Sequence, residues 1–404
     1  MKCCRNAATL AAMLWMASAA AQTEPTADYQ FKGSLSSSAN KKKAPPLVLL
    51  ASGNSFVNTT VDGVERQVLQ FPLHAGLQLQ PTNKLLSSNG DYTIAVLAGL
   101  DDVSGRRRLV DFKSGSSDSG LYETSGSLSF APLANGSSAA VAKPGEFHQY
   151  VVTRNASTGR LAGYLDGLPT FAVTDSGGLG VISAEKALRF FYDNTTDGTT
   201  GEDASGQVAR IRLFPAEMNS EAVAQLDWVP GGPQHTATVN FTYLPATTPL
   251  AFGDTVEWRF YDSAGHTVTD ESGTNAFESG YQTKGGVFTQ QFDAAGTYEY
   301  GCAFHSSMHG TVAVAMTAKP AEGGTATSFT LKWALAKAAS GFVYDVEIQR
   351  PSDSAFVSFR NGTTKNSASF VADAGAGTYQ FRARRRSLTS GAVAFSPVLL
   401  IKVS

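Results

Sequence analysis

The sequence has little charge and no long hydrophobic run. Its 32 basic and 34 acidic residues nearly cancel, to a formal net charge of −2, and no tract holds five or more charges of one sign. This balance excludes a nucleic-acid-binding or polybasic membrane-binding function, and the basic triplets at 41–43, 106–108 and 384–386 are interpreted as solvated faces or linker. No segment beyond the N-terminus is apolar for long enough to predict a membrane span.

The first 21 residues follow the pattern of a secretory signal peptide. Lys2 and Arg5 give a positive start, a short apolar run extends from Ala7 to Ala17, and the small residues 19–21 suit a cleavage site. We therefore expect an exported protein, periplasmic or extracellular, whose mature form lacks residues 1–21.

Cysteine is also scarce, with three residues in the whole chain. Cys3 and Cys4 lie within the expected signal peptide, which leaves Cys302 alone. Exported proteins usually pair their cysteines in disulfides, and an odd thiol in an oxidising compartment is a hazard unless something occupies it. Cys302 is therefore either a buried, inert thiol or a ligand.

Helical periodicity is nearly absent, whereas short runs of alternating polar and apolar residues are common. This alternation is typical of antiparallel sheets with one buried face, so the chain is predicted to be all-β. Turn-rich breaks at 229–234 and 319–324 divide it into three consecutive β-sandwich domains, at 27–229, 235–318 and 325–404.

The first segment is predicted to form a large sandwich. A short helix follows its last strand within 218–226, with Asn219 or Ser220 as the cap. The expected strands cover 92–100, 148–155, 161–167, 188–194 and 207–214. Through YVVTRNASTGRLAGYLDG and EDASGQVARIRLFPAEMNSEAVAQL the segment resembles the laminin-G/concanavalin-like family. The resemblance implies a jelly roll, with a polysaccharide or cell-surface ligand as a candidate partner.

The second and third segments have the alternation of smaller sandwiches. The second has three expected faces, formed by Val239, Phe241 and Tyr243, by Val256, Trp258 and Phe260, and by Tyr298, Tyr300 and Cys302. About seven or eight such strands predict a Greek key. The third segment, through Trp333 and GTYQFRARR, resembles a fibronectin type III domain. It is interpreted as a structural spacer or an adhesive module.

The segment YEYGCAFHSSMHG carries the ligand chemistry. Cys302, His305 and Met308 lie within one loop between two strands, at a spacing that brings a thiolate, an imidazole and a thioether toward one point. A thiolate with imidazoles and a weak thioether is the ligand set of an electron-transfer copper site. A second histidine is still needed, and His266 follows a buried strand at the start of a loop.

The stretches GDTVEWRFYDSAGHTVTD and FDAAGTYEYGCAFHSSMHGTVAV resemble the cupredoxins, the blue copper proteins of the plastocyanin and amicyanin kind. The resemblance implies one type 1 copper held by four residues, with His305 near the surface as the electron exit and an apolar docking patch around it. The implied ligands are His266, Cys302, His305 and Met308, and the patch candidates are Phe304, Ala264 and Gly265. Ser306 stands where the family often has proline. We further expect the sulfur to be buried beneath Tyr300 and Trp258.

Each ligand also has a structural alternative. Cys302 could be a core thiol, His266 a hydrogen-bonded loop histidine, His305 a surface histidine, and Met308 a core filler, since methionine commonly fills gaps. His309 is expected to point into solvent.

An acidic loop near the end of the first segment suggests a weaker site. Oxygen-rich loops suit calcium, and the alternative is a solvated acidic loop. The residues concerned are Asp193, Asp197, Glu202 and Asp203.

The sequence therefore predicts an exported copper protein that transfers single electrons to a redox partner protein and is not a self-contained enzyme. The flanking domains are expected to tether it to a polysaccharide, a surface or a partner. The alternative is a glycan- or surface-binding adhesion protein in which copper is structural, stored or vestigial. A third interpretation is an accessory to an oxidase or reductase, and a single type 1 site with no second copper cluster argues against self-contained oxidase chemistry.

Overall fold

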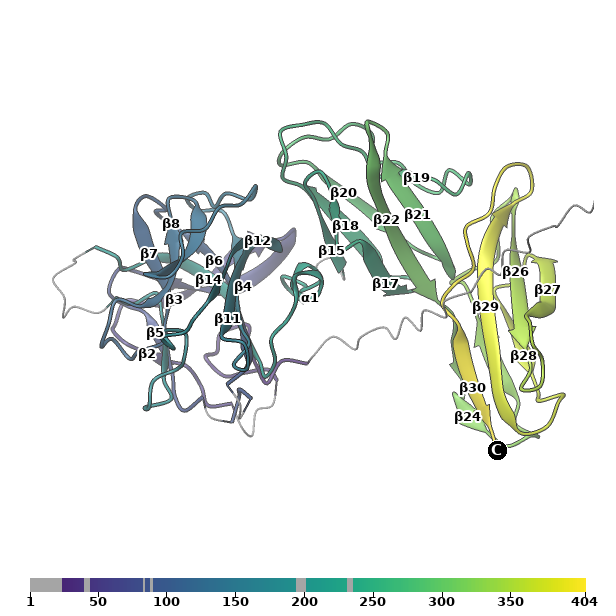
Figure 1. Cartoon of the computed structure of the whole chain (residues 1–404), viewed down its shortest axis with the longest axis horizontal. Coiled ribbons are helices and arrows are strands. Elements are labelled where there is room, and N and C mark those ends of the chain that lie inside the picture. The colour runs from purple at the N-terminus through teal and green to yellow at the C-terminus, as the bar shows by residue number, and fades with distance from the viewer. Residues whose placement is uncertain (1–23, 40–43, 83, 88–89, 194–200, 231–234) are drawn as a thin grey trace, which may run out of the picture.

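A computed structural model of the chain describes residues 24–39, 44–82, 84–87, 90–193, 201–230 and 235–404. The expected signal peptide lies outside these residues. Within them the fold is nearly all β, with several separate sheets that form β-sandwich modules, as the alternation predicts. Three modules follow one another from the N-terminal to the C-terminal side (Figure 1). No helix in the described part of the chain has the length and apolar character needed to cross a membrane.

The first module packs an eight-stranded sheet against a six-stranded one. The orders are β12-β11-β10-β6-β14-β4-β3, with β1 paired to β14, and β2-β5-β13-β7-β8-β9. The strands are β1 Ala27–Tyr29, β2 Val48–Leu49, β3 Ser55–Val61, β4 Val64–Phe71, β5 Leu77–Leu79, β6 Tyr92–Leu100, β7 Arg106–Asp111, β8 Gly120–Thr124, β9 Ser127–Ala131, β10 His148–Arg154, β11 Arg160–Leu165, β12 Leu168–Thr174, β13 Leu188–Phe190 and β14 Gly206–Phe214.

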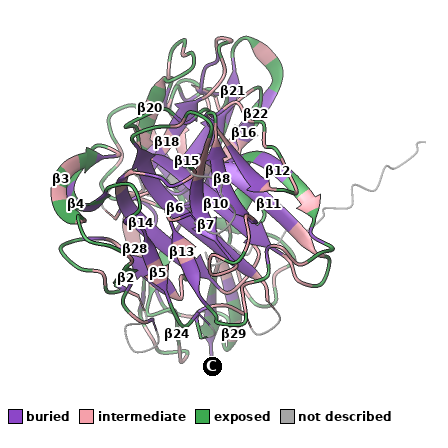
Figure 2. Ribbon diagram, turned by 90° about the vertical axis from the view of Figure 1, so that its left-hand side faces the viewer, coloured by how far each residue is buried: buried purple, intermediate pink, exposed green. Residues whose placement is uncertain are grey.

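Strand β6 is buried at every position, because both of its faces are covered. Ile94 and Val96 face the core between the two sheets, whereas Ala95 and Leu97 belong to separate clusters on the opposite face. Figure 2 shows this burial along the strands of the first module and the exposed outer hairpin β3–β4. The predicted helix is shorter than expected, α1 Ser220–Ala224, and its cap is Asn219, whose side chain accepts from the backbone N–H of Ala222 at 2.9 Å.

The second module has two four-stranded sheets, in the orders β16-β15-β18-β20 and β17-β22-β21-β19. The pairs β15–β18 and β17–β22 are parallel and the others antiparallel. The strands are β15 His235–Val239, β16 Tyr243–Leu244, β17 Thr247–Ala251, β18 Thr255–Phe260, β19 Thr269–Asp270, β20 Val287–Gln291, β21 Gly296–Cys302 and β22 His305–Ala315.

Two of the three predicted faces of this module are buried throughout, and the third is buried at Val239 and Tyr243 but not at Phe241. Trp258 and its neighbours on β18, and Tyr300 and its neighbours on β21, lie in one core cluster. Phe241, expected to share a face with Val239, is instead 53% exposed. Strand β15 ends at Val239, and Phe241 adopts a φ of +52° that turns the chain out of the strand alternation.

The third module pairs a three-stranded sheet, β23-β25-β28, with a five-stranded one, β24-β30-β29-β26-β27. Its first strand begins at Thr317, so the segment 319–324, expected as a linker, contains strand residues. The strands are β23 Thr317–Lys319, β24 Glu322–Gly323, β25 Phe329–Lys332, β26 Phe342–Gln349, β27 Val357–Thr363, β28 Ser367–Phe370, β29 Gly377–Ser387 and β30 Leu399–Val403. Trp333 and Tyr379 are buried in its core. On β29, Phe381 and Ala383 face this core, and Arg382, Arg384 and Arg386 alternate with them on the other face, where they pair with Glu347 and Asp345.

Candidate metal centre

Two segments at one end of the second module bring the predicted ligands together, the loop after β18 and the connection from β21 to β22. Strand β21 ends at Cys302 and strand β22 begins at His305, and these two residues are cross-strand partners in the ladder. His266 lies in the loop after β18, where its backbone N–H and C=O exchange hydrogen bonds of 2.9 Å each with Gln282. The backbone on both sides of the site is therefore held by sheet or ladder hydrogen bonds.

The three donor atoms have the spacing of ligands to one metal ion. The Cys302 Sγ lies 3.9 Å from His266 Nδ1 and 3.4 Å from His305 Nδ1, and all three donors lie within 4.8 Å of one another. Bonds of about 2.3 Å to sulfur and about 2.0 Å to nitrogen would place these atoms about 3.5 to 3.7 Å apart at tetrahedral or trigonal angles. The observed separations bracket that range, so the residues fit a thiolate–imidazole metal site.

His266 is fully buried, and its outer nitrogen faces a carboxylate. Its Nε2 has no hydrogen-bond partner, and the nearest charged atom is Asp262 Oδ2 at 3.6 Å. Metal-bound histidines commonly direct their second nitrogen at such a group, which selects the tautomer that leaves the first nitrogen free for the metal. Asp262 therefore orients His266.

Burial lowers the pKa of His266, the nearby His305 lowers it further, and Asp262 opposes both effects. His266 thus stays neutral below its ordinary titration range, as a metal ligand must. Since the unfolded chain binds this proton more readily, the stability that His266 contributes is present above its unfolded pKa of about 6.5 and is lost as the pH falls.

Replacing Asp262 by asparagine is expected to weaken metal binding by about 10- to 100-fold, the usual cost of losing a carboxylate that supports a ligand. Competition titration with a chelator of known affinity measures this change. Glu278→Gln is the matched control, because it removes a carboxylate of the same module that accepts a hydrogen bond from Thr269 rather than from a ligand. Equal affinities for the Asp262 variant and the native protein would contradict the role assigned to Asp262.

The sulfur of Cys302 is enclosed by backbone and aromatic groups. The side chain is 7% exposed, and the backbone N–H of Thr267 donates to Sγ at 3.4 Å. The Tyr243 hydroxyl donates in turn to the Thr267 carbonyl. Tyr300 and Trp258 belong to the same core cluster as Cys302, and Trp258 Nε1 donates to the Tyr300 hydroxyl at 3.2 Å. The Cys302 sulfur therefore lies at the edge of a buried aromatic core.

Met308 and His309 have opposite environments on β22. Met308 is 2% exposed and packs in the same cluster as Cys302, a placement that suits either an axial ligand or a core filler. His309 is exposed, as expected, and its Nδ1 lies 2.9 Å from Glu271 Oε2, which raises the pKa of His309. It points to a carboxylate rather than to the sulfur, so it does not compete with the three ligands.

Aromatic side chains surround the outer edge of the site. Phe241 makes edge-on ring contacts with His266 at 5.1 Å and with His305 at 5.3 Å. Phe304 and Tyr281 contact each other edge-on and are 59% and 63% exposed. Tyr281 also covers Gly265, where any side chain would collide with its ring. We call Phe241, Tyr281 and Phe304 the aromatic rim.

Of the predicted patch residues, Phe304 is in the aromatic rim and Gly265 lies beneath it. The sequence pattern did not identify Phe241, Tyr281, Asp262 or Thr267 as residues of the site. Asp262 could have been found, because it precedes His266 by four residues in a loop. Thr267, which directly follows His266, could have been found in the same way, whereas Phe241 and Tyr281 come from positions that only the folded chain brings to the site.

The acidic loop of the first module does not form a free oxygen cage. Asp193 and Glu202 approach Asp118, but Arg108 pairs with Asp193 and Asp118, and Arg106 pairs with Glu202. Asp203 accepts from the Asp193 backbone N–H at 2.8 Å and contacts His74 Nδ1 at 2.6 Å, and Asp197 is outside the described residues. The oxygens of Asp118, Asp193 and Glu202 lie within 4.8 Å of one another and share two arginines, so calcium binding stays a prediction.

No protein-family model matches the chain, and no curated protein matches it. Among solved structures, the chain is similar to a reduced-state amicyanin mutant at 28% identity and to an oxidized amicyanin mutant at 26%, over 20% of this chain and 80% of each of theirs. It is also similar to a purple cupredoxin from Nitrosopumilus maritimus at 26% identity, over 20% of this chain and 98% of that one. All three TM-scores are 0.19. The case for a metal site in this chain therefore rests on the geometry of His266, Cys302 and His305.

Proposed function

We propose that this protein binds one copper ion at His266, Cys302 and His305, with Met308 as a weak axial ligand, and carries single electrons rather than catalysing a reaction by itself. The observation that carries the proposal is the convergence of one buried thiol and two imidazole nitrogens within 4.8 Å. Copper, when bound, supplies a one-electron couple between Cu(I) and Cu(II).

The donor set supports copper over zinc. Structural zinc sites almost always complete four strong sulfur, nitrogen or carboxylate ligands. Here the three donors are a thiol and two imidazoles, and the Met308 thioether, buried in the same core cluster as Cys302, is a weak fourth donor that could complete the set. Two imidazoles and a thiolate in a trigonal arrangement with a long thioether are typical of blue-copper sites.

The surroundings of the three ligands support electron transfer in two ways, through a backbone held by hydrogen bonds and through a partly exposed His305. Hydrogen bonds to Thr267 and Gln282 hold the ligand backbone, so the geometry has little freedom to change with oxidation state. His305 is partly exposed and lies against the aromatic rim, which offers a redox partner protein a short, apolar path to the site. We also propose that the protein works after export, in the periplasm or outside the cell.

Replacing Met308 by leucine tests the axial role. The thiolate-to-copper band should persist, because the three strong ligands remain, and the midpoint potential should rise, because loss of a donor to Cu(II) favours Cu(I). A tenfold change in the relative affinity for the two oxidation states is about 59 mV for a one-electron couple, and voltammetry should show a rise on that order. An unchanged potential would make Met308 a core filler.

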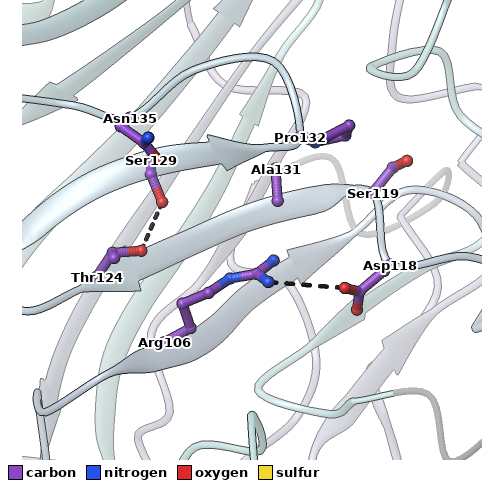
Figure 3. A pocket seen from close by; sticks show the side chains of 8 residues that line it. All are labelled: Arg106, Asp118, Ser119, Thr124, Ser129, Ala131, Pro132 and Asn135. Atoms are coloured by element: carbon purple, nitrogen blue, oxygen red, sulfur yellow. Dashed lines mark hydrogen bonds and ion pairs between the residues drawn. The ribbon is translucent and has the colours of Figure 1, made fainter. Parts of the chain in front are cut away.

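A second candidate function, binding of a polar surface ligand by the first module, is favoured by one observation. An open pocket of about 300 Å³ lies on the sheet β7-β8-β9, and Arg106, Asp118, Thr124 and Ser129 are among its lining residues. In Figure 3, Arg106 extends beside Asp118, and the hydroxyls of Thr124 and Ser129 approach each other to 2.6 Å. Neutral hydroxyl-rich ligands such as a polysaccharide suit these groups. Retention of the full chain on immobilised polysaccharides tests this function, with Ser129→Leu as the variant that fills the pocket.

A further inference from the structure

The loop that carries His266 begins with a residue, Tyr261, whose side chain packs against the first module. Tyr261 is the first residue after β18, and its partly buried side chain packs against the core cluster of the first module. Burial beside Asp166 raises the pKa of the Tyr261 hydroxyl well above its ordinary value. Tyr261 therefore belongs by sequence to the metal-binding module and by packing to its neighbour.

Further contacts between the two modules gather around the same end of β18. Arg259 forms an ion pair with Asp62, at the turn between β3 and β4, and both side chains are 9% exposed. The Arg259 guanidinium also lies over the ring of Trp228, 3.7 Å from its centroid. On the other side of the loop, Lys284 Nζ donates to the Ala139 carbonyl at 3.2 Å. A buried, paired charge and a cation–π contact make this a fixed docking rather than an incidental touch.

The segment between Tyr261 and His266 is short and held at both ends. Tyr261 is fixed by the first module and by a backbone bond from its N–H to the Val239 carbonyl, and His266 is fixed by its two bonds to Gln282. Between them, Asp262 accepts from the Ala264 backbone N–H at 2.8 Å and faces His266 Nε2. A loop with so few free residues has few conformations, so a shift of Tyr261 must reach Asp262 and His266.

We propose that the first module positions the metal ligand His266, with Tyr261 as the positioning residue that transmits its docking to the site. The role toward copper rests on the proposed function, whereas the anchoring of the loop does not. Metal geometry and docking of the first module are then coupled, and a change in one changes the other.

Hydrogen exchange of the metal-free full chain tests the anchoring. In Tyr261→Ser, the amide of His266 should exchange about tenfold faster than in the native protein, because the loop has lost one anchor. Amides in β22 such as Val312 should be unchanged, which shows that the module is still folded. Tyr261→Phe keeps the ring and should restore slow exchange. If β22 also exchanges faster in the serine variant, Tyr261→Leu replaces it in the comparison.

The copper-loaded proteins test the consequence for the ligand. Tyr261→Ser should alter the electron paramagnetic resonance spectrum of Cu(II) and the midpoint potential, and Tyr261→Phe should match the native protein in both. Slow exchange at His266 in the serine variant would overturn the proposal, as would a native spectrum and potential. Failure of the native protein to bind copper would instead refute the proposed function and leave the exchange result to decide on the anchoring.

Discussion

Replacing Cys302 by serine should abolish the intense thiolate-to-copper absorption band and lower copper affinity by more than about 100-fold, since loss of an outer supporting group alone costs 10- to 100-fold. The sulfur is the only thiol in the described chain, and both imidazole Nδ1 atoms are directed toward it. Serine is close in size but its hydroxyl stays protonated near neutral pH, so it does not replace the thiolate. Copper titration followed by visible absorption measures both effects.

His309→Ala is the matched control for that experiment. This histidine lies next to Met308 in the sequence, but it is exposed and held by Glu271 and the Ser306 carbonyl. Its loss should leave the band and the affinity unchanged. If the serine variant kept the band, or if the alanine variant lost it, the ligand assignment would be wrong.

The second large effect concerns the core beneath the site. Replacing Trp258 by alanine should reduce the free energy of unfolding of the second module by about 3 to 5 kcal/mol, as is usual for a fully buried aromatic residue. Trp258 is 0% exposed, and its ring packs against four others at centroid distances of 5.5 to 6.3 Å. The Tyr300 hydroxyl also loses the hydrogen bond that Trp258 Nε1 donates to it.

Hydrogen exchange of β21 and β22 amides in the metal-free protein measures this stability for the second module alone, apart from its neighbours. Tyr300→Phe is the smaller companion change, since it removes only the hydroxyl acceptor and leaves the Trp258 N–H unpaired, at about 1 to 3 kcal/mol. If the alanine variant were destabilised by less than the phenylalanine variant, the ring would not have the central packing role described.

Alternation along the strands and loop spacing predicted much of the fold and most of the site. The period of two placed Val256, Trp258 and Phe260 on one buried face, because side chains on a strand point alternately to opposite sides. The spacing of Cys302 and His305 within one loop predicted that the two side chains lie close together. In the structure the two residues are cross-strand partners in the ladder. These are local properties, so they can be read from the sequence.

Contacts between distant segments could not be predicted in this way. Phe241 was expected in a strand face, but its positive φ carries it out to the two histidine rings. Tyr261 directly follows β18 of the second module and packs against the core of the first module. Val393 belongs to the third module by sequence and packs in the core of the second module. The pairing of the acidic loop with Arg106 and Arg108 could not be predicted either, because these arginines are about ninety residues away in the sequence.

The most direct test of the central claim is X-ray absorption at the copper edge of the metal-loaded full chain. The account predicts one short copper–sulfur distance near 2.3 Å and two copper–nitrogen distances near 2.0 Å, by analogy with metal–thiolate and metal–imidazole bonds in general. A copper environment made only of nitrogen and oxygen, with no short sulfur bond, would contradict it.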